Sequence, residues 1–341
     1  MRRPLLFALA VAVLIPVGSA APRAVPGATA RPARPVHTYS IVARDSVTGE
    51  IGVAVQSHWF SVGSGVPWAE SGVGAVATQS FTEISYGPLG LDLMRAGKSA
   101  PQALAALLAA DPQREVRQVA MVDAHGRVAV HSGKNCIAEF GHHPGAQYSV
   151  QANLMEKNTV WDAMARAYET TRGDLAERML AALEAAQREG GDIRGRQSAA
   201  IIVVSGTPSG SPWRDRTIDL RVEDSPEPVK ELRRLVDVQR AYQHMNAGDA
   251  CLEAGDIDGA LESYGTAAKM LPGNPEVRYW AAVTMLTSGH EAEGLELLRK
   301  VFADAPEWVE VTRRLPAAGL LPDDPALMKK IEGLAPKPAR R

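Results

Sequence analysis

The sequence predicts an α+β domain folded as a four-layer αββα sandwich, followed by an all-α domain of helical repeats. Two observations support this prediction. In the first 240 residues, blocks of strand-like patterns are separated by pairs of helix-like patterns. Beyond residue 240, small and aromatic residues recur at the spacing of a helical repeat. Strand blocks separated by helix pairs favour two stacked, mainly antiparallel sheets with helices on both outer faces over a parallel βαβ sheet.

Eight segments of the first domain have the alternation or apolar content of strands. They are residues 38–43, 51–56, 73–79, 116–122, 128–131, 148–152, 199–204 and 217–222. The helical patterns cover residues 88–95, 99–109, 160–170 and 175–189, and a further helix begins beyond Pro228. Ser99 and Gln102 have the spacing of a capping box, which predicts the start of the second helix. The Gly-, Pro- and Ser-rich segment before residue 73 is predicted to be a loop.

The N-terminus has the three-part pattern of a secretory signal peptide. Two arginines precede an apolar run that ends at Val17, and small residues follow it. We therefore expect a signal peptide at residues 1–20, a flexible linker at 21–37 and a periplasmic or extracellular mature protein. The apolar run is too short to span a bilayer comfortably, so no stable membrane span is expected after processing. A buried N-terminal helix is the alternative.

The charge balance argues against a nucleic-acid partner. The chain has 341 residues with 37 Lys and Arg against 39 Asp and Glu, which gives a formal net charge of −2. Such a chain offers no overall electrostatic attraction to phosphate backbones. Aromatic residues make up only 5% of the sequence, which also argues against proteins that bind by stacking on bases.

The cysteines and histidines do not have the spacing of a metal site or a disulfide framework. Cys136 and Cys251 are far apart and are predicted to be two isolated thiols in different domains, with an interdomain disulfide as the alternative. The adjacent pair His142 and His143 is predicted to lie in a solvated loop, and no metal site is expected.

The C-terminal third has the pattern of tetratricopeptide repeats. Residues at the small, aromatic and proline positions of a 34-residue unit are Gly248, Ala260, Tyr264, Ala267 and Pro272. A shift by one unit places Ala282, Gly294, Val301 and Pro306 at the corresponding positions, which predicts a second, weaker repeat. Residues 315–334 are predicted to form a degenerate cap. An ordinary helical hairpin is the alternative.

The predicted domains are therefore residues 38–240 and 241–341. Two repeats are fewer than the roughly three that usually make such an array stable by itself. We expect the repeats to pack on the first domain or to associate with a second copy of the chain, and to dock a protein partner.

An ordered series of short motifs lies between residues 38 and 240. The motifs are TYSIVARD at residues 38–45, Gly49, GVAV at 52–55 and Ser57, PWA at 67–69, GVGAVATQ at 72–79, YGP at 86–88, RQ at 117–118, Asp123 with GR at 126–127, GRQSA at 195–199 and DLRV at 219–222. Together they resemble the DUF1028 family, whose fold belongs to the N-terminal nucleophile (Ntn) hydrolase superfamily. The resemblance implies an αββα sandwich, which agrees with the order of strands and helices, but the family does not define a substrate.

The resemblance to active Ntn hydrolases identifies Thr38 as the candidate nucleophile. In these enzymes a Thr, Ser or Cys at a new N-terminus attacks the substrate, and its own α-amino group is the base. Removal of a signal peptide would leave residues 21–37 before Thr38, so its amine would still be blocked. Activity then requires a second cleavage between His37 and Thr38. The alternative is that Thr38 is a β-branched residue that simply begins a strand.

Four further residues are candidates from matching positions. Asn153 resembles the Asn of the family's Gly-Asn segment, with Ala152 in place of the glycine, and its amide is a candidate oxyanion donor. Its alternative role is to cap the turn into the next helix. Arg44, Ser57 and Gln79 are candidates for substrate binding. Their alternative role is to satisfy backbone groups within the sheets.

The sequence therefore predicts an exported Ntn-hydrolase-like amidohydrolase. It is expected to transfer the acyl group of a small amide or peptide, possibly derived from the cell wall, to Thr38, and to need no cofactor. The alternative is a non-catalytic protein that uses the Ntn fold to bind a ligand or a partner.

Overall fold

The computed structural model describes residues 38–336, and the signal peptide and linker predicted at 1–20 and 21–37 lie outside this range. Within residues 38–336, the strands form two antiparallel sheets, ordered β10-β9-β2-β1-β8-β7 and β3-β4-β5-β6. The larger sheet contains β1 (Thr38–Arg44), β2 (Ile51–Ser57), β7 (Gly141–Gly145), β8 (Tyr148–Ala152), β9 (Ser198–Val204) and β10 (Arg216–Val222). The smaller sheet contains β3 (Pro67–Glu70), β4 (Gly74–Ser80), β5 (Arg117–Asp123) and β6 (Val128–Ser132).

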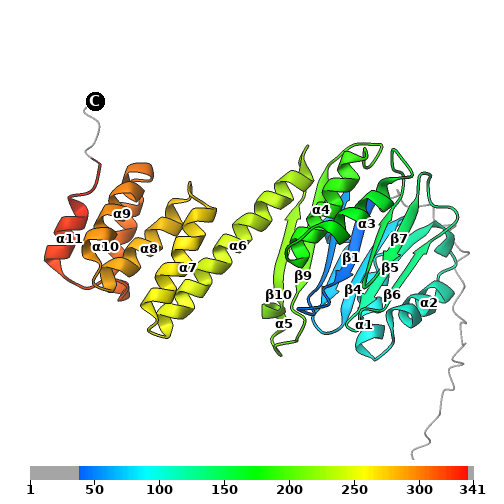
Figure 1. Ribbon diagram of the computed structural model, residues 1–341, viewed down its shortest axis with the longest axis horizontal. Helices are drawn as coiled ribbons and strands as arrows, with labels where there is room; N and C mark the ends of the chain where they lie inside the picture. Colours follow the sequence, from blue (N-terminus) through cyan, green and yellow to red (C-terminus); the bar gives the residue numbers. More distant parts are fainter. Residues whose placement is uncertain (1–37, 337–341) are drawn as a thin grey trace, which may run out of the picture. The chain divides into compact units, whose positions relative to one another are not determined.

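Helices cover the outer face of each sheet (Figure 1). The smaller sheet is covered by α1 (Tyr86–Arg95) and α2 (Ala100–Ala110), and the larger sheet by α3 (Val160–Thr170), α4 (Leu175–Arg188) and the first part of α6 (Pro228–Glu253). Side chains alternate along each strand, so that one set packs on the helices and the other set packs on the opposite sheet. In β5, Met121 packs on the helices, whereas Ala120 and Val122 face the other sheet. The predicted four-layer αββα sandwich is confirmed.

The local start signal for α2 is present as predicted. The Ser99 Oγ accepts a hydrogen bond from the backbone N–H of Gln102, and the Gln102 side chain accepts one from the backbone N–H of Ser99. This reciprocal pair satisfies two N–H groups at the start of the helix. Three short 3-10 segments and one short helix complete the connections: Val62–Ser64, Arg114–Val116, Pro316–Ala318 and α5 (Pro212–Asp215).

Two segments predicted to be loops are strands. β3 lies in the Gly-, Pro- and Ser-rich segment, and β7 contains His142 and His143, so the prediction of a solvated loop there was wrong. Both strands lie at an edge of their sheet, where a proline is tolerated because its missing N–H is not needed by a second neighbour. The two segments therefore pair with β4 and β8 although their sequences contain Pro67 and Pro144.

A single helix, α6, passes through the boundary predicted between residues 240 and 241. Near its N-terminus, Leu232 and Val236 belong to the core on the outer face of the larger sheet. Farther along, Ala241 and Met245 pack in a second core with α7 (Ile257–Met270). The boundary stays a prediction, but the helix joins both cores without a break.

The helical region after α6 consists of helix pairs. Its remaining helices are α8 (Pro275–Thr287), α9 (Glu291–Asp304), α10 (Trp308–Arg314) and α11 (Pro325–Glu332). Gly248 lies against the ring of Tyr264, and a Cβ at residue 248 would come within 2.8 Å of that ring. The small residues therefore allow the paired helices to approach closely, as the repeat pattern predicts. Within the segment predicted to be a cap, Leu327 and Ile331 of α11 complete the core that α8 and α9 begin.

Both cysteines are free, so the prediction of two isolated thiols is confirmed and the alternative of an interdomain disulfide is wrong.

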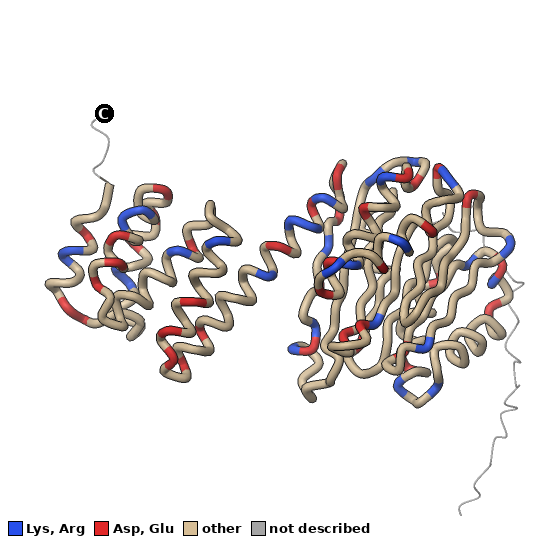
Figure 2. The backbone as a smooth tube through the Cα atoms, viewed as in Figure 1, with Lys and Arg blue, Asp and Glu red and all other residues tan. Residues whose placement is uncertain are grey.

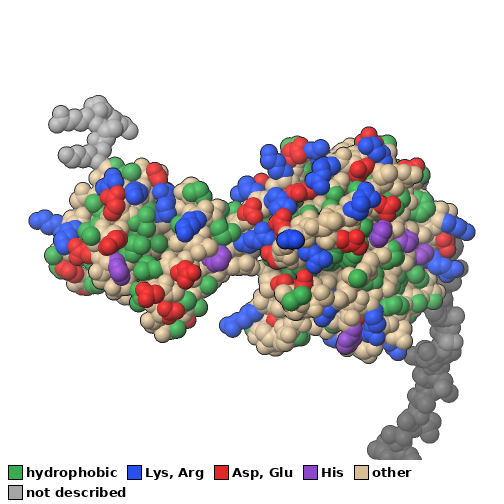
Figure 3. All heavy atoms as spheres, viewed as in Figure 1, with side chains coloured by type: hydrophobic (Ala, Val, Ile, Leu, Met, Phe, Trp, Pro, Cys, Tyr) green, Lys and Arg blue, Asp and Glu red, His purple; other side chains and the backbone are tan. Residues whose placement is uncertain are grey.

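Charged side chains of both signs are interspersed along the helices and are sparse on the strands (Figure 2). On the face shown in Figure 3, Lys and Arg lie beside Asp and Glu over much of the surface. In residues 38–336, no helix is both long and apolar enough to cross a bilayer.

Candidate functional site

Thr38 begins β1 at one end of the larger sheet, and its side chain is completely buried. The register pairs it with Ser57, the last residue of β2, and pairs Ser57 in turn with Ser198, the first residue of β9. The Thr38 Oγ1 donates a hydrogen bond to the Ser57 Oγ at 3.2 Å. Three hydroxyl residues therefore lie side by side at the end of the sheet where β1 begins.

The carbonyl oxygen of Thr38 is surrounded by amide donors. It accepts hydrogen bonds from the Gln79 Nε2 at 3.2 Å, from the backbone N–H of Asn153 at 3.1 Å and from the Asn153 Nδ2 at 3.5 Å. Gln79 comes from β4 of the smaller sheet, whereas Asn153 follows β8 of the larger sheet. The two sheets thus meet at Thr38 through polar side chains.

Gln118 of β5 connects these amides to each other. Its Oε1 accepts from the Gln79 Nε2 at 2.7 Å and from the Asn153 Nδ2 at 2.9 Å. Its Nε2 donates to the Ser132 Oγ at 2.8 Å and to the carbonyl oxygens of Ala152 and Gly141 at 3.0 and 3.2 Å. Because Gln118 uses both ends of its amide, it fixes the orientation of the Gln79 and Asn153 side chains.

The polar network continues along the inner face of the larger sheet. The Ser40 Oγ donates to the Gln79 Oε1 at 2.6 Å, and the Gln151 Nε2 donates to the Ser40 Oγ at 2.6 Å. These side chains are completely buried. Farther from Thr38, the same interface between the sheets is apolar, with Val42, Val53 and Ala77 among its members. The space between the sheets is therefore polar at the Thr38 end and apolar beyond it.

The structure brings together four of the five predicted site residues, namely Thr38, Ser57, Gln79 and Asn153. Arg44 is separate, because it ends β1 whereas Thr38 begins it, and six residue steps of strand span about 20 Å. The Arg44 Nη1 instead donates to the Gln147 Oε1 at 2.6 Å, and its backbone N–H donates to the Gln147 carbonyl. In the structure, Arg44 thus holds the turn between β7 and β8.

Sequence reasoning did not single out Gln118 and Gln151 as members of this site. A signal was available for Gln118, because it belongs to one of the matching motifs and alternates with the apolar residues Val119 and Met121, which face the helices. Gln151 had only its position in a predicted strand. The pairing of the sheets decided that these two amides face Thr38.

An imidazole lies at the outer edge of the same network. The His142 Nδ1 is 2.9 Å from the Ser132 Oγ, which accepts the hydrogen bond from Gln118. Burial lowers the pKa of His142, and the neighbouring His131 and His143 lower it further, so the ring is neutral near pH 7. Among the residues that the structure describes, no group of three or more His, Cys, Asp or Glu side chains is arranged to hold a metal ion.

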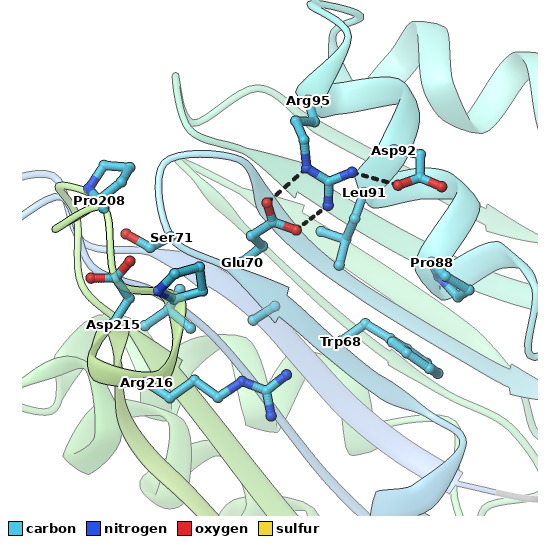
Figure 4. Close-up of a pocket in the computed structure, with 14 residues that line it drawn as sticks. Trp68, Glu70, Ser71, Pro88, Leu91, Asp92, Arg95, Pro208, Asp215 and Arg216 are labelled. Atoms are coloured by element: carbon cyan, nitrogen blue, oxygen red, sulfur yellow. Dashed lines mark hydrogen bonds and ion pairs between the residues drawn. The ribbon is translucent and has the colours of Figure 1, made fainter.

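A separate cavity of about 520 Å³ lies at the other end of the sandwich (Figure 4). Its lining includes Val204, the last residue of β9, whereas Ser198 begins that strand beside Ser57. On one wall, Arg95 is held by the carboxylates of Glu70 and Asp92. This cavity is therefore distinct from the network around Thr38.

Comparisons with known proteins agree with this architecture. The family model for DUF1028, a family of unknown function, matches residues 38–232, and a tetratricopeptide repeat model matches residues 252–313. The predicted repeats are thereby confirmed, and they indicate a protein partner.

Among solved structures, the chain is similar to protein SPO2555 from Silicibacter pomeroyi, itself assigned to DUF1028. The two are 28% identical with a TM-score of 0.52, over 59% of this chain and 88% of that one. No curated protein matches the sequence. The family match covers more than half of the chain and begins at Thr38, and the protein belongs to the DUF1028 family.

Proposed function

We propose that this protein is an Ntn-type amide hydrolase whose nucleophile is Thr38, and that its tetratricopeptide repeats dock a protein partner. One observation carries the proposal. Thr38 is the first residue of a central strand, lies in the polar layer between the sheets and has its Oγ1 3.2 Å from the Ser57 Oγ. An N-terminal nucleophile needs this position at the head of a strand, with hydrogen-bonding groups around its hydroxyl.

The proposed reaction uses the α-amino group that cleavage after His37 would release. This amine, with an ordinary pKa near 8, takes the proton from the Thr38 Oγ1 as that oxygen attacks the carbonyl carbon of the amide. The tetrahedral intermediate then expels the amine part of the substrate. The α-ammonium group of Thr38 gives its proton to this leaving amine. Water then hydrolyses the ester on Thr38. The amide of Asn153 is the candidate donor to the oxyanion.

Export is part of the same proposal. The signal peptide predicted at residues 1–20 would direct the chain to the periplasm or the cell exterior. A second cleavage between His37 and Thr38 would then convert an inactive precursor into the enzyme. The substrate class is a small amide or peptide, with cell-wall peptides as the first to test.

Sequencing the N-terminus of the protein secreted by its natural host tests the proposal. We expect a mature chain that begins with Thr38, hydrolyses peptide anilides, loses this activity in Thr38→Ala and keeps part of it in Thr38→Ser. Ser57→Ala is the matched control for loss of a buried hydroxyl beside the nucleophile, and it should reduce activity without abolishing it. Normal hydrolysis by a chain that still carries residues before Thr38 would refute the assignment of the nucleophile.

A second candidate function is non-catalytic binding of a ligand or a partner. It is favoured by the hydrogen bonds of the Gln79 and Gln118 amides, both of which are satisfied within the protein. Under this function, Thr38→Ala would leave the binding of a partner unchanged and the wild-type protein would hydrolyse no amide. The two functions therefore differ in the effect of one substitution.

A further inference from the structure

Two adjoining cavities lie at the end of the larger sheet where Thr38 is located, and both are lined by Arg196. One has a volume of about 350 Å³ and is lined by His58, Arg196, Gln197, Asp224, Ser225 and Pro226. The other, of about 380 Å³, lies between α4 and the start of α6. Its charged lining residues are Glu184, Arg188, Arg196, Glu227, Lys230 and Arg233.

The register of the strands places the first cavity close to Thr38. His58 directly follows Ser57, the partner of Thr38, and Arg196 lies two residues before Ser198, the partner of Ser57. Neighbouring strands are about 4.8 Å apart, so the start of β9 lies about 10 Å from the start of β1. The first cavity therefore lies at the same end of the larger sheet as Thr38.

Cations outnumber carboxylates in the lining of the second cavity. It has four cationic side chains, Arg188, Arg196, Lys230 and Arg233, against two carboxylates. Arg233 is paired with Glu177 and Glu184. Among residues 38–336, Arg188 and Lys230 have no ion-pair partner within 4 Å. The excess of positive charge favours an anion at Arg196, which borders both cavities.

The guanidinium group of Arg196 retains donors for a ligand. Its Nη1 is bound by Glu227, and its side chain is 36% exposed. Within residues 38–336, no other hydrogen bond engages this guanidinium group, and its planar fork matches the two oxygens of a carboxylate. Arg196 also lies close to Tyr39. Burial raises the pKa of the Tyr39 phenol, and the positive charge of Arg196 opposes this increase.

We propose that Arg196 is an anion-binding subsite for the substrate, so that the amide cleaved at Thr38 carries a free carboxylate. This inference deepens the proposed function and rests on it. The substrate class is an acylated amino acid or short peptide with a free C-terminal carboxylate. The neighbouring cations strengthen the attraction but are not required to contact the ligand.

Calorimetric titration of the full chain with N-acetyl-Ala-Ala and with its C-terminal amide tests the subsite. A charge-assisted bidentate contact should make the acid bind about tenfold more tightly than the amide. Arg196→Gln should remove this preference, and Arg196→Lys should restore part of it. Arg172→Gln removes the same charge from the exposed loop after α3 and is the matched control, with affinity within about twofold of wild type.

Equal affinities for the acid and the amide in the wild-type protein, or an unchanged preference in a folded Arg196→Gln protein, would overturn the inference. Thermal unfolding followed by circular dichroism verifies that each variant is folded. A different result would refute the proposed function. If the chain that begins at Thr38 prefers the acid but hydrolyses no amide, the anion subsite stands and the catalytic role of Thr38 is refuted.

Discussion

Replacing Gln118 with Met should destabilise the protein by about 3 kcal/mol, whereas the same replacement at Gln56 should stabilise it. Both glutamines lie in strands and are completely buried. They differ in their hydrogen bonds. The Gln118 amide makes five, whereas neither the Nε2 nor the Oε1 of Gln56 has a hydrogen-bond partner within the part of the chain that the structure describes.

The magnitude follows from the partners that lose their bonds. Three of the five hydrogen bonds of Gln118 are fully buried, those with Gln79, Asn153 and the carbonyl of Ala152. At a net cost of about 1 kcal/mol each, their loss amounts to about 3 kcal/mol. Met has nearly the same volume as Gln, so little packing is lost. At Gln56, Met removes an unsatisfied buried amide, which should stabilise the fold by about 1–2 kcal/mol.

The free energy of unfolding of the wild type and the two variants can be measured by urea denaturation, with circular dichroism to follow the helices of the sandwich. The Gln56→Met variant is the matched control, because it makes the same chemical change at the same degree of burial. If the two variants change the free energy of unfolding by the same amount, with the same sign, the reasoning from hydrogen-bond partners is refuted.

The packing of the repeats and the acid stability of the sandwich can be tested in the same way. Gly248→Ala should lower the stability of the helical region by about 1–3 kcal/mol, because the new Cβ would come within 2.8 Å of the Tyr264 ring. Gly265→Ala, on α7 with open space around it, should instead raise stability by up to about 1 kcal/mol in thermal unfolding. Similar effects at both glycines would contradict the close approach. Burial alone would raise the pKa of Asp123, but hydrogen bonds from three backbone N–H groups and from the Arg127 side chain outweigh it, and the folded-state pKa is lowered. Its carboxylate therefore stabilises the fold above about pH 4, and this contribution is lost as the pH falls through the folded-state pKa. Asp123→Asn should make the unfolding temperature fall less steeply below pH 4, and an unchanged slope would disprove this role.

Much of the fold could be predicted because the signals for it are local. Alternation and helical periodicity located the elements of the sandwich, and the capping pair Ser99 and Gln102 marked the start of α2. The two strands that were missed, β3 and β7, contain prolines and lie at sheet edges, where pairing on one side is enough. Their pairing depends on neighbours far away in the sequence, which local patterns do not contain.

The candidate site could be predicted only in part. The resemblance to Ntn hydrolases made Thr38 the candidate nucleophile, because such a nucleophile begins a strand, and Ser57 lies opposite it in the adjacent strand. Arg44 belongs to the same strand as Thr38, but proximity in sequence became a separation of about 20 Å once the strand was extended. Linear motifs thus identified the strand but not which of its ends carries the polar layer.

The sequence by itself determined most of the elements, the order of sandwich and helical repeats, and the residue that begins the first strand. Only the tertiary structure decided which buried amides meet. Gln56, Gln118 and Gln151 all lie in strands and look alike in the sequence, yet Gln118 and Gln151 face the space between the sheets, whereas Gln56 faces α4 on the same side as Ala54. Alternation specifies that neighbouring side chains point to opposite faces, but the pairing and stacking of the sheets decide which face is which.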